Sequence, residues 1–143
     1  MNPTPDPSAP PSSEAPAFDV VSLGEGLIEF NQTREGGGRQ FLQGVGGDTS
    51  NVAIAAARHG ASVAFVTRVG GDEFGRLLLD LWAAEGIDTR GVDIGLEEHT
   101  GVYFVTHSEH GHTFSYLRST SAASRMSASH LPEDIIAAEV LRR

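Results

Sequence analysis

The chain has 143 residues, which is enough for one domain with a substantial core but marginal for two. Acidic residues outnumber basic ones by 19 to 10, and the net charge of −9 disfavours nucleic acid and anionic membrane surfaces as partners. All ten basic residues are arginine and cysteine is absent, which excludes a Walker A or Schiff-base lysine, a disulfide and a thiolate zinc site. A chain without cysteine is typical of the cytoplasm.

The first 17 residues differ in composition from the rest of the chain. Six of the seven prolines lie in residues 1–16, so residues 1–17 are predicted to be a disordered leader without a function of its own. The folded domain is predicted to cover residues 18–143. No window approaches the roughly 18 consecutive apolar residues that would be needed to span a bilayer.

Strands and helices are predicted to alternate along the folded part. Apolar runs predict strands at 18–23, 40–43, 61–69 and 92–94, and helical spacing predicts helices at 51–59, 72–85 and from 131 onward. Residues 31–39 are polar and rich in glycine, which indicates a loop. Alternating polarity at 101–106 and 113–118 predicts a β-hairpin. Together these elements predict an α/β fold, a βαβ sheet that carries a β appendage.

A pair of glycines directly before the first helix is the strongest local signal. Gly46 and Gly47 would let the backbone approach a ligand closely, and Asn51 would extend an amide from the first helical turn. The same residues are also compatible with an ordinary turn in which Asp48 or Thr49 caps the helix. A dinucleotide-binding fingerprint needs a third glycine three residues after the second one. Gly24 and Gly26 are followed by glutamate at position 29, and Gly44 and Gly46 by threonine at position 49, so neither cluster fits.

Two carboxylates and the hairpin are further candidates for ligand contacts. Glu25 and Glu29 follow the first strand, where open α/β sheets bind ligands, although a solvated acid is the more common role of a lone glutamate. Tyr103, Tyr116 and Arg118 lie on hairpin faces that would suit a sugar acid, with the guanidinium on its carboxylate. The alternative is a sheet face that packs on the domain or on another subunit.

The hairpin also carries three histidines, His107, His110 and His112. Only His107 and His112 would lie side by side, because His110 falls at the turn. With no cysteine and no nearby carboxylate except Glu109, a solvated hairpin tip is favoured over a zinc site.

Three motifs in this order give the chain a family resemblance. Residues 23–30 read Leu-Gly-Glu-Gly-Leu-Ile-Glu-Phe, residues 46–53 contain the glycine pair, and residues 68–75 read Arg-Val-Gly-Gly-Asp-Glu-Phe-Gly. The folded chain thereby resembles the ribokinase-like (PfkB) carbohydrate kinases. Residues 100–104 and 116–125 look most like the branch that phosphorylates 2-keto-3-deoxygluconate.

The resemblance implies a fold, a reaction and a set of site residues. The fold would be a ribokinase-like α/β fold, a Rossmann-type βαβ sheet with a small β-sheet lid, and the reaction an ATP- and Mg²⁺-dependent phosphorylation of a sugar hydroxyl. By position in the motifs, the resemblance implies that the substrate is bound by Glu29, Gly46, Gly47, Asn51, Tyr103, Tyr116 and Arg118. A homodimer formed through the lid is also implied.

One family signature is missing from the chain. The sequence Asp-Thr-x-Gly-Ala-Gly-Asp, which supplies the catalytic base and the anion hole in the family, has no counterpart here. We therefore expect roughly the first half of a kinase, without catalytic residues, metal ligands or a nucleotide site, and inactive alone. The alternatives are a kinase for a neutral sugar such as fructose or ribose, and a non-catalytic sugar-binding or dimerisation module.

Overall fold

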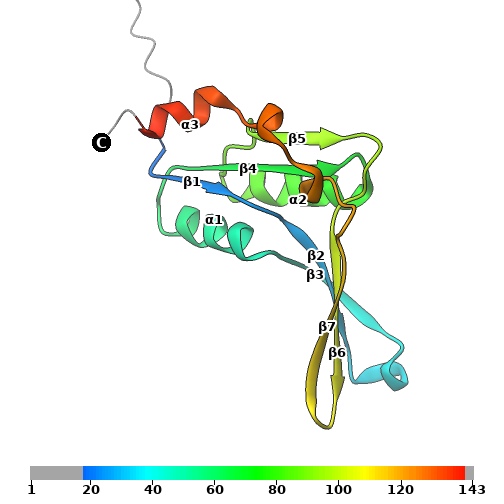
Figure 1. The fold of residues 1–143 in the computed structure, drawn as a ribbon. Helices are drawn as coiled ribbons and strands as arrows, with labels where there is room; N and C mark the ends of the chain where they lie inside the picture. Colours follow the sequence, from blue (N-terminus) through cyan, green and yellow to red (C-terminus); the bar gives the residue numbers. More distant parts are fainter. Residues whose placement is uncertain (1–17, 141–143) are drawn as a thin grey trace, which may run out of the picture.

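A computed structural model describes residues 18–140 of the chain. The leader predicted at residues 1–17 lies outside the described residues. The described part forms two β-sheets, and the helices pack against one of them (Figure 1). The other sheet extends away from this layered part as an arm.

The first sheet, called the core sheet below, contains three parallel strands in the order β1-β4-β5. These strands are β1 (Val20–Leu23), β4 (Val63–Gly70) and β5 (Val92–Gly95). The strands predicted at 18–23, 61–69 and 92–94 are therefore confirmed to within two residues. The chain connects β4 to β5 through α2 (Glu73–Ala84), which confirms the predicted βαβ unit.

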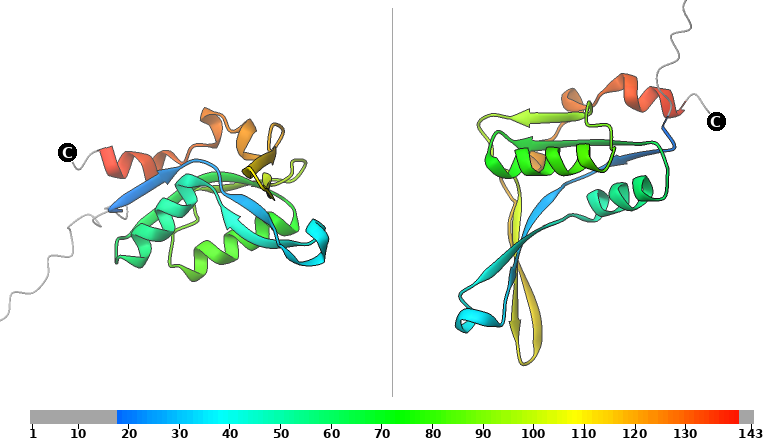
Figure 2. Two further views of the ribbon diagram at one scale, coloured as in Figure 1. Left: turned by 90° about the horizontal axis from the view of Figure 1, so that it is seen from below. Right: turned by 180° about the vertical axis from the view of Figure 1, so that it is seen from behind.

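The central strand β4 is buried on both faces. Val63, Phe65 and Val69 belong to a core cluster that includes residues of α1 (Asp48–Arg58) and α2. Ala64 and Val66 point the other way and pack with Ile135 of α3 (Glu133–Val140). Figure 2 shows the same arrangement, with α1 and α2 below the core sheet and α3 above it. A continuous apolar run is what such a doubly covered parallel strand requires.

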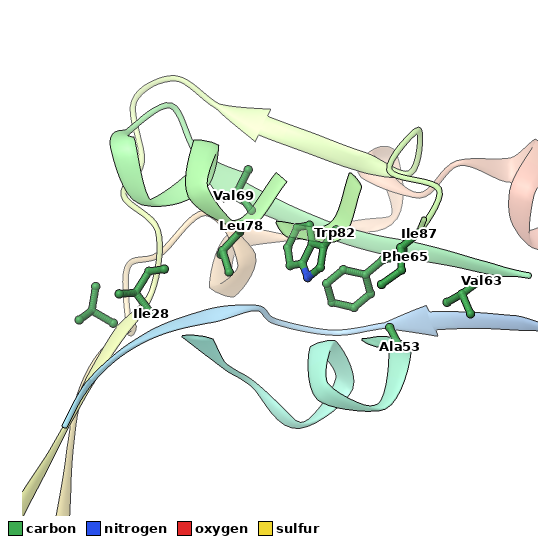
Figure 3. Packing of buried hydrophobic residues seen from close by; sticks show 9 residues of the cluster. Ile28, Ala53, Val63, Phe65, Val69, Leu78, Trp82 and Ile87 are labelled. Atoms are coloured by element: carbon green, nitrogen blue, oxygen red, sulfur yellow. The ribbon is translucent and has the colours of Figure 1, made fainter. Parts of the chain in front are cut away.

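Trp82 is the largest buried side chain of the core. Its ring meets that of Phe65 edge-on, with centroids 4.6 Å apart, and it lies between α2 and the core sheet (Figure 3). The indole N–H donates a hydrogen bond of 2.9 Å to the hydroxyl of Ser50 in α1. This bond satisfies the only polar atom of the tryptophan side chain and ties the two helices together.

The second sheet, called the lid sheet below, has four strands in the order β3-β2-β6-β7. They are β2 (Leu27–Gln32), β3 (Phe41–Gly46), β6 (Val102–Ser108) and β7 (Gly111–Leu117). The predicted hairpin is confirmed as β6 and β7. Strand β2 was not predicted, and it takes the first two residues of the loop expected at 31–39, leaving a short 3-10 helix, η1 (Glu35–Gly38).

β2 and the full length of β3 could not be predicted from the local sequence, because they are stabilised by pairing across the lid sheet. β2 is antiparallel to β3 and parallel to β6, so both of its edges are paired. β3 was predicted only at 40–43, because glycines at 44 and 46 are poor strand formers. Their backbones pair with Glu29 and Leu27 of β2, and tertiary pairing therefore overrides local propensity.

Asp72 joins the start of α2 to the segment that leads into β6 of the lid sheet. Asp72 is the N-cap of α2, and its carboxylate accepts a hydrogen bond of 2.8 Å from the Gly75 amide. The same carboxylate also accepts hydrogen bonds from the amide and the hydroxyl of Thr100. Burial acts to raise the pKa of Asp72, but these hydrogen bonds outweigh it and hold the pKa below its usual value. The carboxylate therefore stays charged at neutral pH.

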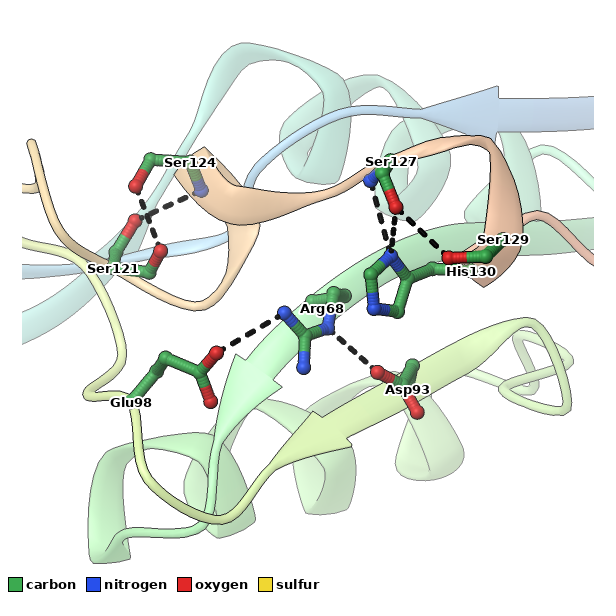
Figure 4. A network of polar contacts seen from close by, with 8 residues as sticks. All are labelled: Arg68, Asp93, Glu98, Ser121, Ser124, Ser127, Ser129 and His130. Carbon is green, nitrogen blue, oxygen red and sulfur yellow. Dashed lines mark hydrogen bonds and ion pairs between the residues drawn. The ribbon is translucent and has the colours of Figure 1, made fainter.

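The face of the core sheet that α1 and α2 do not cover carries polar side chains beneath two short 3-10 helices, η2 (Ala123–Arg125) and η3 (Ala128–His130). Arg68 of β4 bonds to Asp93 at 2.6 Å and reaches Glu98 at 3.4 Å (Figure 4). These carboxylates neutralise a guanidinium whose side chain is only 10% exposed.

Replacing Ser50 tests the bond between the two helices. Ser50→Ala should lower the free energy of unfolding by about 1–3 kcal/mol, because the buried indole N–H loses its acceptor. Urea unfolding followed by circular dichroism measures this change. Val52→Ala, at an exposed position of the same helix, is the control and should change stability by less than about 0.5 kcal/mol. Equal effects of the two substitutions would contradict the assignment.

Candidate sugar site

A cavity of about 370 Å³ lies between the start of α1 and the lid sheet. Its lining comes from four segments that are far apart in the sequence. The lining residues are Glu25, Leu27, Gly47, Asp48, Thr49, Asn51, Tyr103, Phe114, Tyr116 and Arg118. Of the seven predicted site residues, five line this cavity, namely Gly47, Asn51, Tyr103, Tyr116 and Arg118. Gly46 and Glu29 lie directly behind, both against Tyr103.

The two glycines are required by close packing at the start of α1. Gly47 has a φ of 98°, a conformation that disfavours other residues, and a Cβ there would overlap the carbonyl oxygen of Glu25. At Gly46 a Cβ would overlap the hydroxyl of Tyr103. The glycine pair therefore lets α1 begin against the segment after β1 and brings the lid tyrosine close to the helix.

The N-terminus of α1 opens on the cavity without a side-chain cap. The helix begins at Asp48, its N-cap is Gly47, and neither Asp48 nor Thr49 caps it, so the capping hypothesis is wrong. The first helical bond runs from the Asn51 amide to the Gly47 carbonyl at 2.9 Å. Backbone N–H groups of the first turn have no acceptor within a helix, and they are suited to oxygen atoms of a ligand.

Glu29 is occupied by its neighbours in the lid sheet. One carboxylate oxygen accepts the Tyr103 hydroxyl and the other accepts the Asn31 amide at 3.1 Å. His107 continues this chain of contacts, because its Nε2 bonds to the side-chain oxygen Oδ1 of Asn31 at 2.9 Å. Any contact of Glu29 with substrate hydroxyls remains a prediction, and in this structure Glu29 reaches the cavity through Tyr103.

Burial raises the pKa of the Tyr103 phenol, and the hydrogen bond to Glu29 raises it further. Tyr103 is 9% exposed as a residue, and its ring stacks on that of Tyr116 with centroids 5.7 Å apart. Tyr103 therefore faces the cavity as a neutral aromatic side chain, and its hydroxyl keeps its proton and donates a hydrogen bond to Glu29.

Arg118 is paired with an acid of its own chain. Its Nε lies 2.9 Å from Oε2 of Glu25, while Oε1 of Glu25 accepts the Ser121 hydroxyl at 2.7 Å. The guanidinium also lies 5.9 Å from the centre of the Tyr116 ring. The sequence suggested Arg118 as the partner of a substrate carboxylate and Glu25 as a sugar ligand or a solvated acid. The structure instead joins the two side chains at the edge of the cavity.

Several lining residues were not singled out in the sequence. Phe114 precedes Tyr116 by two residues, so the period of a strand could have placed it on the same face. Leu27 lies on β2, which was not predicted. Ser121 does not line the cavity, and although it falls within the motif at 116–125, the motif did not indicate its bond to Glu25. Only the folding of residues 119–121 against the segment after β1 reveals the role of Ser121.

The hairpin histidines lie as the predicted turn requires. His107 and His112 are opposite each other, with ring centroids 6.5 Å apart, and His110 is at the turn. Between residues 18 and 140, no three histidine, aspartate or glutamate side chains are grouped so that they could hold a metal ion. None of the helices in this part of the chain is long and apolar enough to cross a membrane.

The sequence of the whole folded part decides the family. Residues 17–141 match the pattern of the pfkB family carbohydrate kinases. The chain belongs to this family. Fructokinase-1 of Zea mays is 38% identical over 122 residues, which are 82% of this chain but only 38% of the maize protein. This pfkB chain thus spans well under half the length of the curated relatives that it matches.

Solved structures agree with the family assignment. A fructokinase from Xylella fastidiosa with bound ATP superimposes with a TM-score of 0.78 at 32% identity, covering 84% of this chain and 36% of that one. A PfkB protein from Polaromonas sp. JS666 gives 0.76 at 36% identity, covering 82% and 41%. The expected ribokinase-like α/β fold is confirmed. The fructokinase names favour the neutral-sugar alternative, and the 2-keto-3-deoxygluconate branch that the hairpin suggested is not supported.

A spectroscopic titration tests the environment of Tyr103. The chain has two tyrosines, so Tyr116→Phe leaves Tyr103 as the only one. Its absorbance at about 295 nm should rise only well above the usual tyrosine pKa of about 10, because burial and Glu29 favour the neutral phenol. Adding Glu29→Gln should move the transition back toward its usual pH. A normal titration in the single variant would contradict the geometry.

Proposed function

We propose that this chain is the sugar-binding part of a carbohydrate kinase that phosphorylates a neutral hexose such as fructose. The observation that carries the proposal is the cavity at the uncapped N-terminus of α1, closed on the other side by Tyr103 and Tyr116. Helix N–H groups and the Asn51 amide suit sugar oxygens, and the aromatic rings suit the apolar face of a sugar ring. The fructokinase relatives support this substrate class.

The charges of the cavity also support a neutral substrate. Its lining carries the carboxylates of Glu25 and Asp48 against the single guanidinium of Arg118. A sugar acid would meet this net negative lining, whereas a neutral sugar pays no such penalty. The cavity therefore lacks the unpaired cation that a sugar-acid substrate, implied by the hairpin motif, would need for its carboxylate.

The phosphoryl donor of the whole enzyme is proposed to be ATP, with Mg²⁺ as its usual companion. The relative from Xylella fastidiosa has ATP bound. The sugar cavity of this chain does not suit a triphosphate, because two carboxylates and one guanidinium line it. The residues of this chain are therefore assigned to binding and orienting the sugar. The catalytic base belongs to the signature that this sequence lacks.

Substitution of Asn51 tests the sugar site. Asn51→Ala should weaken the binding of D-fructose to the 143-residue chain by about tenfold, because an exposed hydrogen-bonding amide is removed from the cavity. Isothermal titration calorimetry measures the dissociation constants. Asp80→Ala, on the exposed side of α2, is the matched control and should bind fructose like the wild type. A wild-type chain that binds no fructose at millimolar concentrations would refute the proposed function.

Self-association through the lid sheet is the second component of the proposal. Strands β3 and β7 carry large apolar side chains in the open, among them Leu42 with 69% and Phe114 with 48% exposure. Exposed apolar groups gathered on one sheet are typical of a protein interface. A lid-to-lid contact would cover them and close the sugar cavity from outside.

Sedimentation equilibrium tests this contact. We expect the wild-type chain to dimerise, and Leu42→Arg to weaken the dimer at least about tenfold by placing a charge in the contact. Leu96→Arg is the matched control, since Leu96 is 85% exposed on the turn after β5, outside the lid sheet. A wild-type chain that stays monomeric at high concentration, or equal effects of both substitutions, would exclude the lid interface.

A further inference from the structure

The pairing of Glu25 with Arg118 points to a residue that selects the substrate. Only 11% of the Glu25 side chain is exposed, against 51% of Arg118, so the acid is the fixed partner and the guanidinium is the accessible one. The contact lies on the lining of the sugar cavity. The half-exposed guanidinium of Arg118 can therefore contact a ligand in the cavity while it is paired with Glu25.

Glu25 is held by a prepared site and is not a chance surface contact. Ser121 is fully buried, donates its hydroxyl to Glu25 and accepts the Ser124 amide at 3.2 Å. Figure 4 shows Ser121 and Ser124 joined in this way beside the core sheet. A Cβ at position 101 would overlap a carboxylate oxygen of Glu25, so Gly101 leaves the space that the acid occupies.

The ion pair changes what Arg118 offers to a ligand. The guanidinium retains free N–H donors, but its charge is balanced by a carboxylate 2.9 Å away. A second carboxylate on the same guanidinium would face Glu25 at close range, and like charges at such a distance repel. A hydroxyl or carbonyl oxygen of a neutral sugar accepts the same N–H groups without this repulsion.

We propose that Glu25 is a specificity-determining residue that restricts the cavity to neutral sugars by occupying Arg118. This inference rests on the proposed function in placing the sugar in this cavity. Glu25 acts through Arg118 and is a positioning residue. Removal of its charge should convert Arg118 into a site for a sugar carboxylate, bound by charge-assisted hydrogen bonds.

Glu25→Gln tests the inference, with D-gluconate as the probe and the 143-residue chain as the protein. The glutamine keeps the shape and an acceptor for Ser121 but loses the charge. Calorimetry should show gluconate bound about tenfold more tightly by this variant than by the wild type, the scale of one favourable ion pair. Glu97→Gln, at an exposed turn position, removes the same charge elsewhere and should leave gluconate binding unchanged.

Two outcomes would overturn the role of Glu25. One is gluconate binding that is equal in Glu25→Gln and wild type, and the other is an equal gain in Glu97→Gln, which would reflect net charge alone. Adding Arg118→Gln to Glu25→Gln should abolish the gain, and its persistence would also refute the inference. Fructose binding by the wild type tests the proposed function separately, so the two ideas fail independently.

A second variant keeps the inference testable if circular dichroism shows that Glu25→Gln does not fold. Glu25→Ala removes the same charge with a smaller side chain and should also bind gluconate about tenfold more tightly than the wild type does, because Arg118 is again left without its carboxylate partner. Gluconate binding equal to that of the wild type would overturn the inference.

Discussion

The burial of β4 on both faces is the constraint on which the rest of this structure depends. Alternate residues of one strand pack against α1 and α2 on one side and against α3 on the other. Because α1 is held in this way, its N-terminus comes to lie at the end of the core sheet where the lid sheet begins. The Trp82–Ser50 hydrogen bond joins α1 to α2 inside that layer and so helps to position the helix that borders the cavity.

The cavity lies at the joint between the two sheets, and polar contacts hold this joint. Asp72 bonds to Thr100 where the chain enters β6, and Glu25 bonds to Ser121 where the chain returns from β7. Each contact joins the core to one end of the hairpin that carries Tyr103 and Tyr116. The lid tyrosines are therefore positioned by carboxylates that sit in prepared, largely satisfied environments.

Arg118 shows how a motif and a structure lead to different functions for the same residue. In the sequence it is a cation two residues after a tyrosine, which suits a sugar acid. In the structure its charge is balanced by Glu25, a residue 93 positions earlier in the chain. The relatives that the chain matches are named fructokinases, so the comparisons likewise give no support to the sugar-acid branch that the motif suggested.

The sequence by itself determined the elements whose periodicity is strong and the family to which they belong. The apolar run of β4, the amphipathic α2 and the alternating hairpin are local signals, and the glycine pair, Asn51 and the lid residues follow from motifs. The tertiary structure alone decided that β2 is a strand, that Gly47 and no side chain caps α1, and that Glu25 neutralises Arg118. These features depend on pairing and charge contacts between segments far apart in the chain, for which no local pattern exists.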